Sequence, residues 1–157
     1  MGASSETIHG VLVRIFETGV LLTGEAGTGK SDCALGLIDR GHALVADDSV
    51  VVSSMDDVAF GQAPPETAGK LYIRGIGAVD VAEIFGEAAS VGSIPIDLCI
   101  ELVVATSHDE VFLSPKFEEF AIAGVVVPAL RLHAVPGGRE IALLVETAAK
   151  IFEKRRP

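Results

Sequence analysis

The sequence predicts an α/β protein with a mixed sheet, and three observations lead to this expectation. Short apolar or alternating runs, typical of strands, alternate with longer amphipathic segments, typical of helices. Turn residues separate neighbouring strand-like runs in the middle of the chain, which indicates hairpins and therefore antiparallel pairs. The chain has 157 residues, of which 49% are hydrophobic and 22% charged, so residues 1–157 can form one compact domain with a buried core.

The first half of the chain alternates strands and a helix. Residues 11–16 alternate like a half-buried strand, and the apolar run 19–24 is typical of a central strand buried on both faces. Residues 30–40 have the apolar stripe of a helix, and Gly41 can form its left-handed cap. Another apolar strand, 43–46, ends just before Asp47.

The second half is more varied. It is predicted to contain a hairpin and loop over 50–65, a strand, glycine turn and short helix over 70–85, a long strand over 96–105, strands broken by Pro128 within 124–135, and a final helix over 140–155. The apolar residues of the final helix share one face, which is expected to pack on the sheet.

Charge and hydropathy exclude several classes of partner. A formal net charge of −10 argues against a broad electrostatic grip on nucleic acid. The apolar runs are too short to span a bilayer, and the first residues lack the apolar core of a signal peptide. We therefore expect a cytoplasmic protein without a membrane or nucleic-acid partner. Cys33 and Cys99 lie far apart in sequence and are expected to be buried apolar thiols.

The stretch GEAGTGKS has the spacing of a phosphate-binding loop between an apolar strand and an amphipathic helix. Glycines let successive backbone N–H groups point into such a loop, and the following helix N-terminus adds positive potential. Lys30 is expected to contact the transferring phosphate, and the hydroxyl of Ser31 is a ligand that suits Mg²⁺. The predicted nucleotide-binding residues are Gly24, Glu25, Ala26, Gly27, Thr28, Gly29, Lys30 and Ser31.

Asp47 and Asp48 follow the strand 43–46 directly. One interpretation is a solvated turn. The other gives at least one of them a function, because neighbours in an extended chain point to opposite sides. One carboxylate would then face the metal, and the other could take a proton from a hydroxyl nucleophile.

Several segments resemble the catalytic domain of the HPr kinase/phosphorylase family. They are HGVLVRIFETGVLLTGEAGTGKSDCALGLIDRGHALVADDSV, GQAPPETAGKLYIRGIGAVDVAEIFG and GGREIALLVETAAKIF. The resemblance implies a P-loop kinase fold related to phosphoenolpyruvate carboxykinase. It also implies ATP- and Mg²⁺-dependent phosphorylation of a serine on the phosphocarrier protein HPr, a reverse reaction that yields pyrophosphate, and a homo-oligomer, typically a hexamer. Many members carry an N-terminal domain without a counterpart here, so we expect a catalytic domain on its own.

The resemblance also assigns roles to individual residues. His9 matches the family's active-site histidine, and Lys30 matches its catalytic lysine. Ser31 matches the metal-binding hydroxyl. Asp48 matches the residue that acts as base in the kinase direction and as acid in the reverse, which leaves Asp47 nearer the metal.

Two departures from the family pattern bear on the reaction. Tyr72 stands where the family usually has a metal-binding glutamate, so the metal would depend on Ser31 and the aspartates, or Glu66 or a water would take that place. Between Arg74 and Arg131 the chain has no arginine, whereas the family uses one there, especially in phosphorolysis. We therefore expect the forward reaction to exceed the reverse.

Three functional hypotheses follow. The leading one is a serine kinase that acts on HPr. The second is a P-loop kinase of another protein or a small molecule. The third is a module that binds ATP as a regulatory signal and transfers little phosphate, which the tyrosine and the missing arginine favour somewhat.

Overall fold

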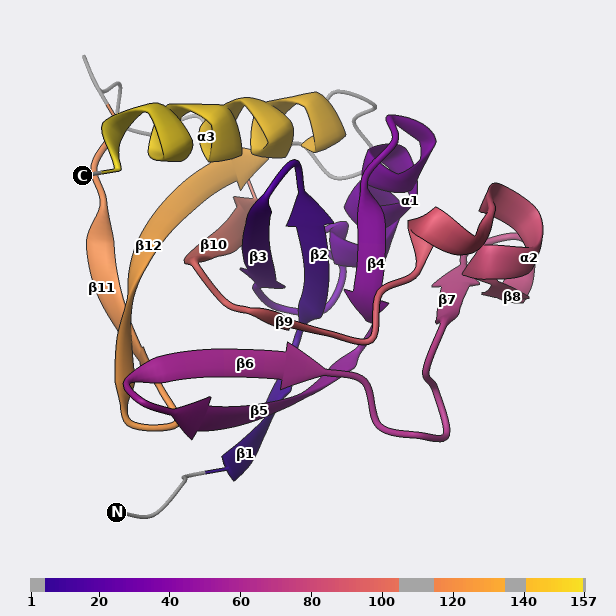
Figure 1. Ribbon diagram of the computed structural model, residues 1–157. Coiled ribbons are helices and arrows are strands. Elements are labelled where there is room, and N and C mark those ends of the chain that lie inside the picture. Colours follow the sequence, from indigo (N-terminus) through magenta and orange to yellow (C-terminus); the bar gives the residue numbers. More distant parts are fainter. Residues whose placement is uncertain (1–4, 105–114, 135–140, 157) are drawn as a thin grey trace.

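The computed structural model describes residues 5–104, 115–134 and 141–156, and their elements form three layers (Figure 1). Two helices, α1 (Lys30–Asp39) and α3 (Ile141–Arg155), cover one face of a six-stranded sheet. A four-stranded sheet covers the other face. The predicted α/β class is confirmed, and the second sheet is an addition that the sequence did not reveal.

The six-stranded sheet carries parallel and antiparallel pairs. Its order is β11 (Glu118–Ile122), β12 (Val125–Ala134), β10 (Leu98–Val104), β3 (Thr18–Thr23), β2 (Val11–Ile15) and β4 (Ala43–Ala46). The three central strands β12, β10 and β3 are parallel, while β11, β2 and β4 each pair antiparallel with a neighbour. Parallel strands in the middle of a sheet are buried on both faces, which agrees with the apolar run of β3 and with the buried first three residues of β10, Leu98–Ile100.

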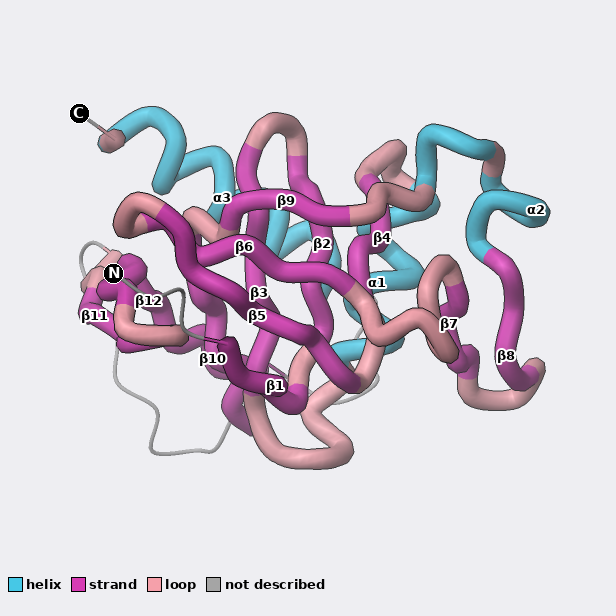
Figure 2. Tube along the Cα trace, turned by 60° about the horizontal axis from the view of Figure 1, so that its bottom comes forward, coloured by secondary structure: helices cyan, strands magenta, loops and turns pink. Residues whose placement is uncertain are grey.

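The four-stranded sheet is antiparallel throughout. Its order is β1 (Ser5–His9), β5 (Ser49–Met55), β6 (Val58–Gln62) and β9 (Ser93–Pro95). Figure 2 shows these strands running across those of the larger sheet. Successive side chains of β2 point to opposite faces of the larger sheet. Val11 and Val13 join the core beneath the helices, and Leu12 joins the core between the sheets.

A separate hairpin lies beside α1. It consists of β7 (Lys70–Ile73) and β8 (Gly77–Asp80), and is followed by α2 (Val81–Phe85) and a 3₁₀ turn, η1 (Glu87–Ala89). Leu71 and Ile73 are buried in the core beneath the helices, whereas the side chain of Tyr72 between them points to solvent. The carboxylate of Asp80 accepts the N–H of Glu83 and so caps α2.

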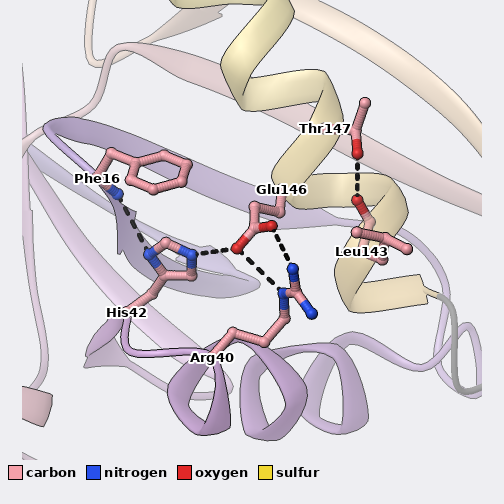
Figure 3. A network of polar contacts seen from close by, with 6 residues as sticks. All are labelled: Phe16, Arg40, His42, Leu143, Glu146 and Thr147. Atoms are coloured by element: carbon pink, nitrogen blue, oxygen red, sulfur yellow. Dashed lines mark hydrogen bonds and ion pairs between the residues drawn. The ribbon is translucent and has the colours of Figure 1, made fainter.

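A buried polar network ties α3 to the end of α1 (Figure 3). Glu146 is 4% exposed and accepts hydrogen bonds from Arg40 Nε at 3.1 Å and Nη2 at 2.7 Å. Its Oε2 lies 2.6 Å from His42 Nε2. The N–H of Phe16 donates to His42 Nδ1 at 3.3 Å, so Nδ1 is the acceptor and the proton lies on Nε2, which donates to Glu146.

Most predicted elements are present, with one correction. Pro128 does not break β12, which continues through it. Pro128 lies opposite Glu119 of β11, and pairing with β10 begins only at Ala129, so the missing proline N–H falls outside that ladder. The expected start of the last helix at Glu140 lies outside the described residues.

Two further expectations concern cysteines and membranes. Cys33 and Cys99 are both buried and unpaired, as predicted, and burial raises the pKa of each thiol to about 12. Among the residues that the structure describes, no helix has the length and apolar character that a bilayer crossing requires.

Candidate active site

The predicted phosphate loop connects β3 to α1. Gly24, Gly27 and Gly29 have φ angles of 135°, 85° and 94°, a region that residues with a Cβ rarely adopt. A Cβ at Gly24 would also lie only 2.5 Å from the carbonyl oxygen of Leu102. Gly29 is the N-cap of α1 and supplies no side chain to bond the first N–H groups of the helix. These N–H groups and the helix dipole suit an anion.

Lys30 lies across the loop with only 8% of its surface exposed. Its Nζ donates to the carbonyl oxygens of Gly24 at 2.7 Å and Glu25 at 3.0 Å. Burial lowers the pKa of Lys30, and the negative charge of Asp48 acts in the opposite direction. The ammonium group is therefore held at the loop, within the electrostatic influence of the second aspartate.

The loop is also braced from within. The hydroxyl of Thr28 donates to the carbonyl oxygen of Glu25 at 2.8 Å, and the N–H of Thr28 approaches the same oxygen at 3.3 Å. Thr28 is buried, and Ala26, which lies between Glu25 and Thr28 in the loop, is exposed. The loop thus has a defined shape, which a backbone cradle for phosphate needs.

Asp47 connects three parts of the site. It is 7% exposed, and its Oδ1 accepts the hydroxyl of Ser31 at 2.9 Å. Its Oδ2 accepts the backbone N–H of Tyr72 at 3.0 Å. Asp47 therefore holds the start of α1, the end of β4 and the β7–β8 hairpin together.

Asp48 points elsewhere. Its side chain is 74% exposed, and its Oδ1 lies 3.3 Å from Nδ1 of His9. Its φ angle is 71°, and the N–H of Ser49 donates to the carbonyl oxygen of Asp47 at 2.8 Å, so Asp48 is the central residue of a γ-turn. The two carboxylates diverge, as expected, but a strained turn separates them rather than the alternation of an extended strand.

The donor set suits Mg²⁺ better than a structural metal. Within the described ranges, no group of three or more His, Cys, Asp or Glu side chains gathers to hold a metal ion. Mg²⁺ needs fewer protein ligands, because nucleotide phosphates and waters complete its octahedral shell. Ser31 and Asp47, adjacent at the base of the phosphate loop, fit an ion that is held together with a nucleotide.

The structure also bears on the two departures from the family pattern. The phenol of Tyr72 is exposed, and the residue contacts Asp47 through its backbone N–H. Glu66, the alternative ligand, is exposed in the loop between β6 and β7. Arg74 is largely exposed, and its Nη2 lies 3.9 Å from Asp32 in the first turn of α1. Part of the segment that should supply the missing arginine lies outside the described residues.

Sequence reasoning missed the backbone donors of the site. The N–H of Tyr72 bonds Asp47, and the N–H of Gly10 bonds the carbonyl oxygen of Asp48 at 3.1 Å. Side-chain type gives no signal for such contacts, because every residue except proline has an N–H. A glycine directly after His9 was the one available clue, since glycine permits close backbone approach.

Known proteins resemble this chain in sequence over nearly its whole length. A family model described as the HPr Serine kinase C-terminal domain matches residues 2–156. An HPr kinase/phosphorylase of Clostridium perfringens is 37% identical over 157 residues, and one of Streptococcus thermophilus is 40% identical over the same length. Each match covers 98% of this chain and 50% of the relative, so the chain spans about half the length of the curated relatives it matches.

A solved structure is similar over nearly its whole length. The Hpr(Ser) kinase/phosphatase from Coxiella burnetii superimposes with a TM-score of 0.88 at 34% sequence identity. The superposition covers 96% of this chain and 97% of the other, which is consistent with the P-loop kinase fold that the family resemblance implied. The chain therefore belongs to the family of HPr serine kinase C-terminal domains.

Proposed function

We propose that this chain is an ATP- and Mg²⁺-dependent kinase that phosphorylates a serine of the phosphocarrier protein HPr. One observation carries the proposal. The phosphate loop with Lys30, the pair of Ser31 and Asp47, and the exposed carboxylate of Asp48 all lie at one end of the six-stranded sheet. Phosphoryl transfer needs phosphate binding, a metal position and a proton acceptor close together.

The roles follow from the chemistry of each group. The loop N–H groups and Lys30 would bind the β- and γ-phosphates of ATP. Asp48 would accept the proton of the attacking serine hydroxyl while the serine oxygen bonds to the γ-phosphorus and the bond to ADP breaks. His9, 3.3 Å from Asp48, would orient that carboxylate. Ser31 and Asp47 would hold Mg²⁺, which neutralises charge on the phosphates when it is bound.

The choice of HPr as substrate rests on family membership, because the similar proteins are named HPr kinases. The same membership supports a cytoplasmic homo-oligomer, with a hexamer as the expected size. The exposed position of Asp48 supports a protein substrate, since a serine on another protein can reach it without deep burial. Phosphorolysis is proposed to be the weaker direction.

Transfer of labelled γ-phosphate tests the proposal. The protein is incubated with Mg²⁺, γ-labelled ATP and purified HPr, and in parallel with HPr whose acceptor serine is replaced by alanine. We expect label on the first HPr only. Nucleotide binding without transfer would favour the sensing module instead. Label on another protein or small molecule from the same cells, with none on HPr, would favour a kinase of a different substrate.

A further inference from the structure

The chain passes between its two sheets twice beside the candidate active site. It passes first at Gly10, between β1 and β2, and again at Asp47–Asp48, between β4 and β5. His9 ends β1 and lies opposite Ser49, which begins β5. The proposed base therefore lies where the smaller sheet joins the larger one, not on the sheet that carries the phosphate loop.

The two passages are bonded to each other. The buried N–H of Gly10 donates to the carbonyl oxygen of Asp48 at 3.1 Å, and the N–H of Ser49 closes the γ-turn onto Asp47 at 2.8 Å. The carbonyl group before Asp48 and the carbonyl group of Asp48 itself are thus both hydrogen-bonded, on either side of its strained φ angle of 71°. A strained conformation persists only where its surroundings determine it, and these two bonds are such surroundings.

Gly10 also packs against the strand that leads into the phosphate loop. A Cβ at Gly10 would lie 2.6 Å from the carbonyl oxygen of Leu22 and 3.4 Å from Cδ1 of Leu21. Its φ angle is not positive, so glycine is needed here for space rather than for an unusual conformation. Leu22 lies in β3, two residues before Gly24. Gly10 therefore fills the gap between the loop's strand and the backbone of Asp48.

We propose that Gly10 is a positioning residue for phosphoryl transfer and that it sets the separation between the Asp48 carboxylate and the phosphate loop. The inference rests on the proposed kinase function. Any side chain at position 10 must push the Asp48 backbone away from β3 or move the loop itself. A displacement of about 1 Å between reacting groups can lower a rate about 100-fold, although both groups stay present.

The test compares Gly10→Ala with Gly19→Ala. Gly19 is a matched control, because its added Cβ would also meet a backbone carbonyl, that of Pro95 at 1.9 Å, but at the opposite end of β3 from the phosphate loop. Thermal unfolding gives the folded fraction of each variant. Per folded molecule, we expect kcat for HPr phosphorylation to fall about 10- to 100-fold in Gly10→Ala, with ATP affinity within about 3-fold of wild type. Gly19→Ala should lose stability but keep kcat.

Amide hydrogen exchange on the wild-type protein supplies a second test that does not require a folded variant. The Gly10 amide should exchange as slowly as amides of the β2–β3 ladder, because it is buried and bonded. Fast exchange at Gly10, or equal loss of kcat in both variants, would overturn the proposal. Absence of transfer in the wild type would instead refute the kinase function, and slow exchange at Gly10 would still be found.

Discussion

Replacement of Glu146 by glutamine should strongly destabilise the fold. The Glu146 carboxylate accepts hydrogen bonds from Arg40 Nε, Arg40 Nη2 and His42 Nε2, so each of these partners is a donor. A glutamine keeps one acceptor oxygen and turns an NH₂ group toward a donor. A lost bond to a charged group costs about 1.5–3 kcal/mol, and a buried donor without a partner costs about 1–3 kcal/mol. The Arg40 side chain is 43% exposed and can form hydrogen bonds with water instead. We therefore expect the free energy of unfolding to fall by about 3 kcal/mol.

The assay is thermal and urea unfolding followed by circular dichroism at pH 7. For a chain of this length, about 3 kcal/mol corresponds to a fall in Tm of roughly 6–12 °C. Glu153→Gln is the control on the same helix, because Glu153 accepts from Thr18 at 2.8 Å and is only half-buried. It should cost about 1 kcal/mol. A loss for Glu146→Gln no larger than that of the control would refute the reasoning.

The same network predicts how stability depends on pH. The pKa of Glu146 is lowered from its ordinary value of 4.5 to about 2, first by the hydrogen bonds from Arg40 and then by the bond from His42, against the opposite effect of burial. Protonation therefore favours the unfolded chain. The stabilisation is complete above about pH 5 and is lost as pH falls from 4.5 to about 2. The difference in unfolding free energy between wild type and Glu146→Gln should shrink over that window.

Three further predictions concern the chemistry. Lys30→Ala should abolish transfer to HPr while the circular dichroism spectrum stays native, and unchanged turnover would contradict the kinase proposal. Asp48→Asn should lower kcat and leave ATP affinity intact in a titration, because a base is needed only for chemistry; if Asp47→Asn gives that profile instead, the two roles are reversed. Release of pyrophosphate from phosphoserine-HPr should be slower, relative to ATP-driven phosphorylation, than is usual for the family. The reason is that phosphorolysis brings two anions together, and the sequence between Arg74 and Arg131 has no arginine to offset their repulsion. Comparable rates in both directions would show that another cation takes the place of the missing arginine.

Local signals correctly predicted the secondary structure around the proposed phosphate loop. The glycine spacing before Lys30 and the helical pattern after it are set within one short segment, and the structure has β3, the loop and α1 at the expected positions. The predicted divergence of Asp47 and Asp48 is also present, although through a γ-turn. These features depend on neighbours in sequence, which is why one sequence was enough to find them.

Two strands could not be predicted in the same way, β1 of the smaller sheet and β11 of the larger one. Residues 5–9 are mostly polar and exposed, and they form β1 only because β5 pairs with them from far along the chain. Residues 118–122 are nearly all exposed, so β11 shows no alternation that would mark it. The contacts from Gly10 and Tyr72 to the aspartates depend on this long-range pairing and on backbone groups, neither of which leaves a local pattern.

The division of the site between two sheets has a consequence for folding. The phosphate loop belongs to the contiguous segment β3–α1–β4, whereas His9 ends β1 and Asp48 directly precedes β5, two strands that pair across a gap of about forty residues. A chain in which β3, the phosphate loop and α1 keep their structure while β1 has separated from β5 would therefore keep its proposed nucleotide site but lose the paired strands at whose ends His9 and Asp48 lie. During heating, we expect opening of the smaller sheet alone to end the proposed phosphoryl transfer while the proposed nucleotide site stays intact.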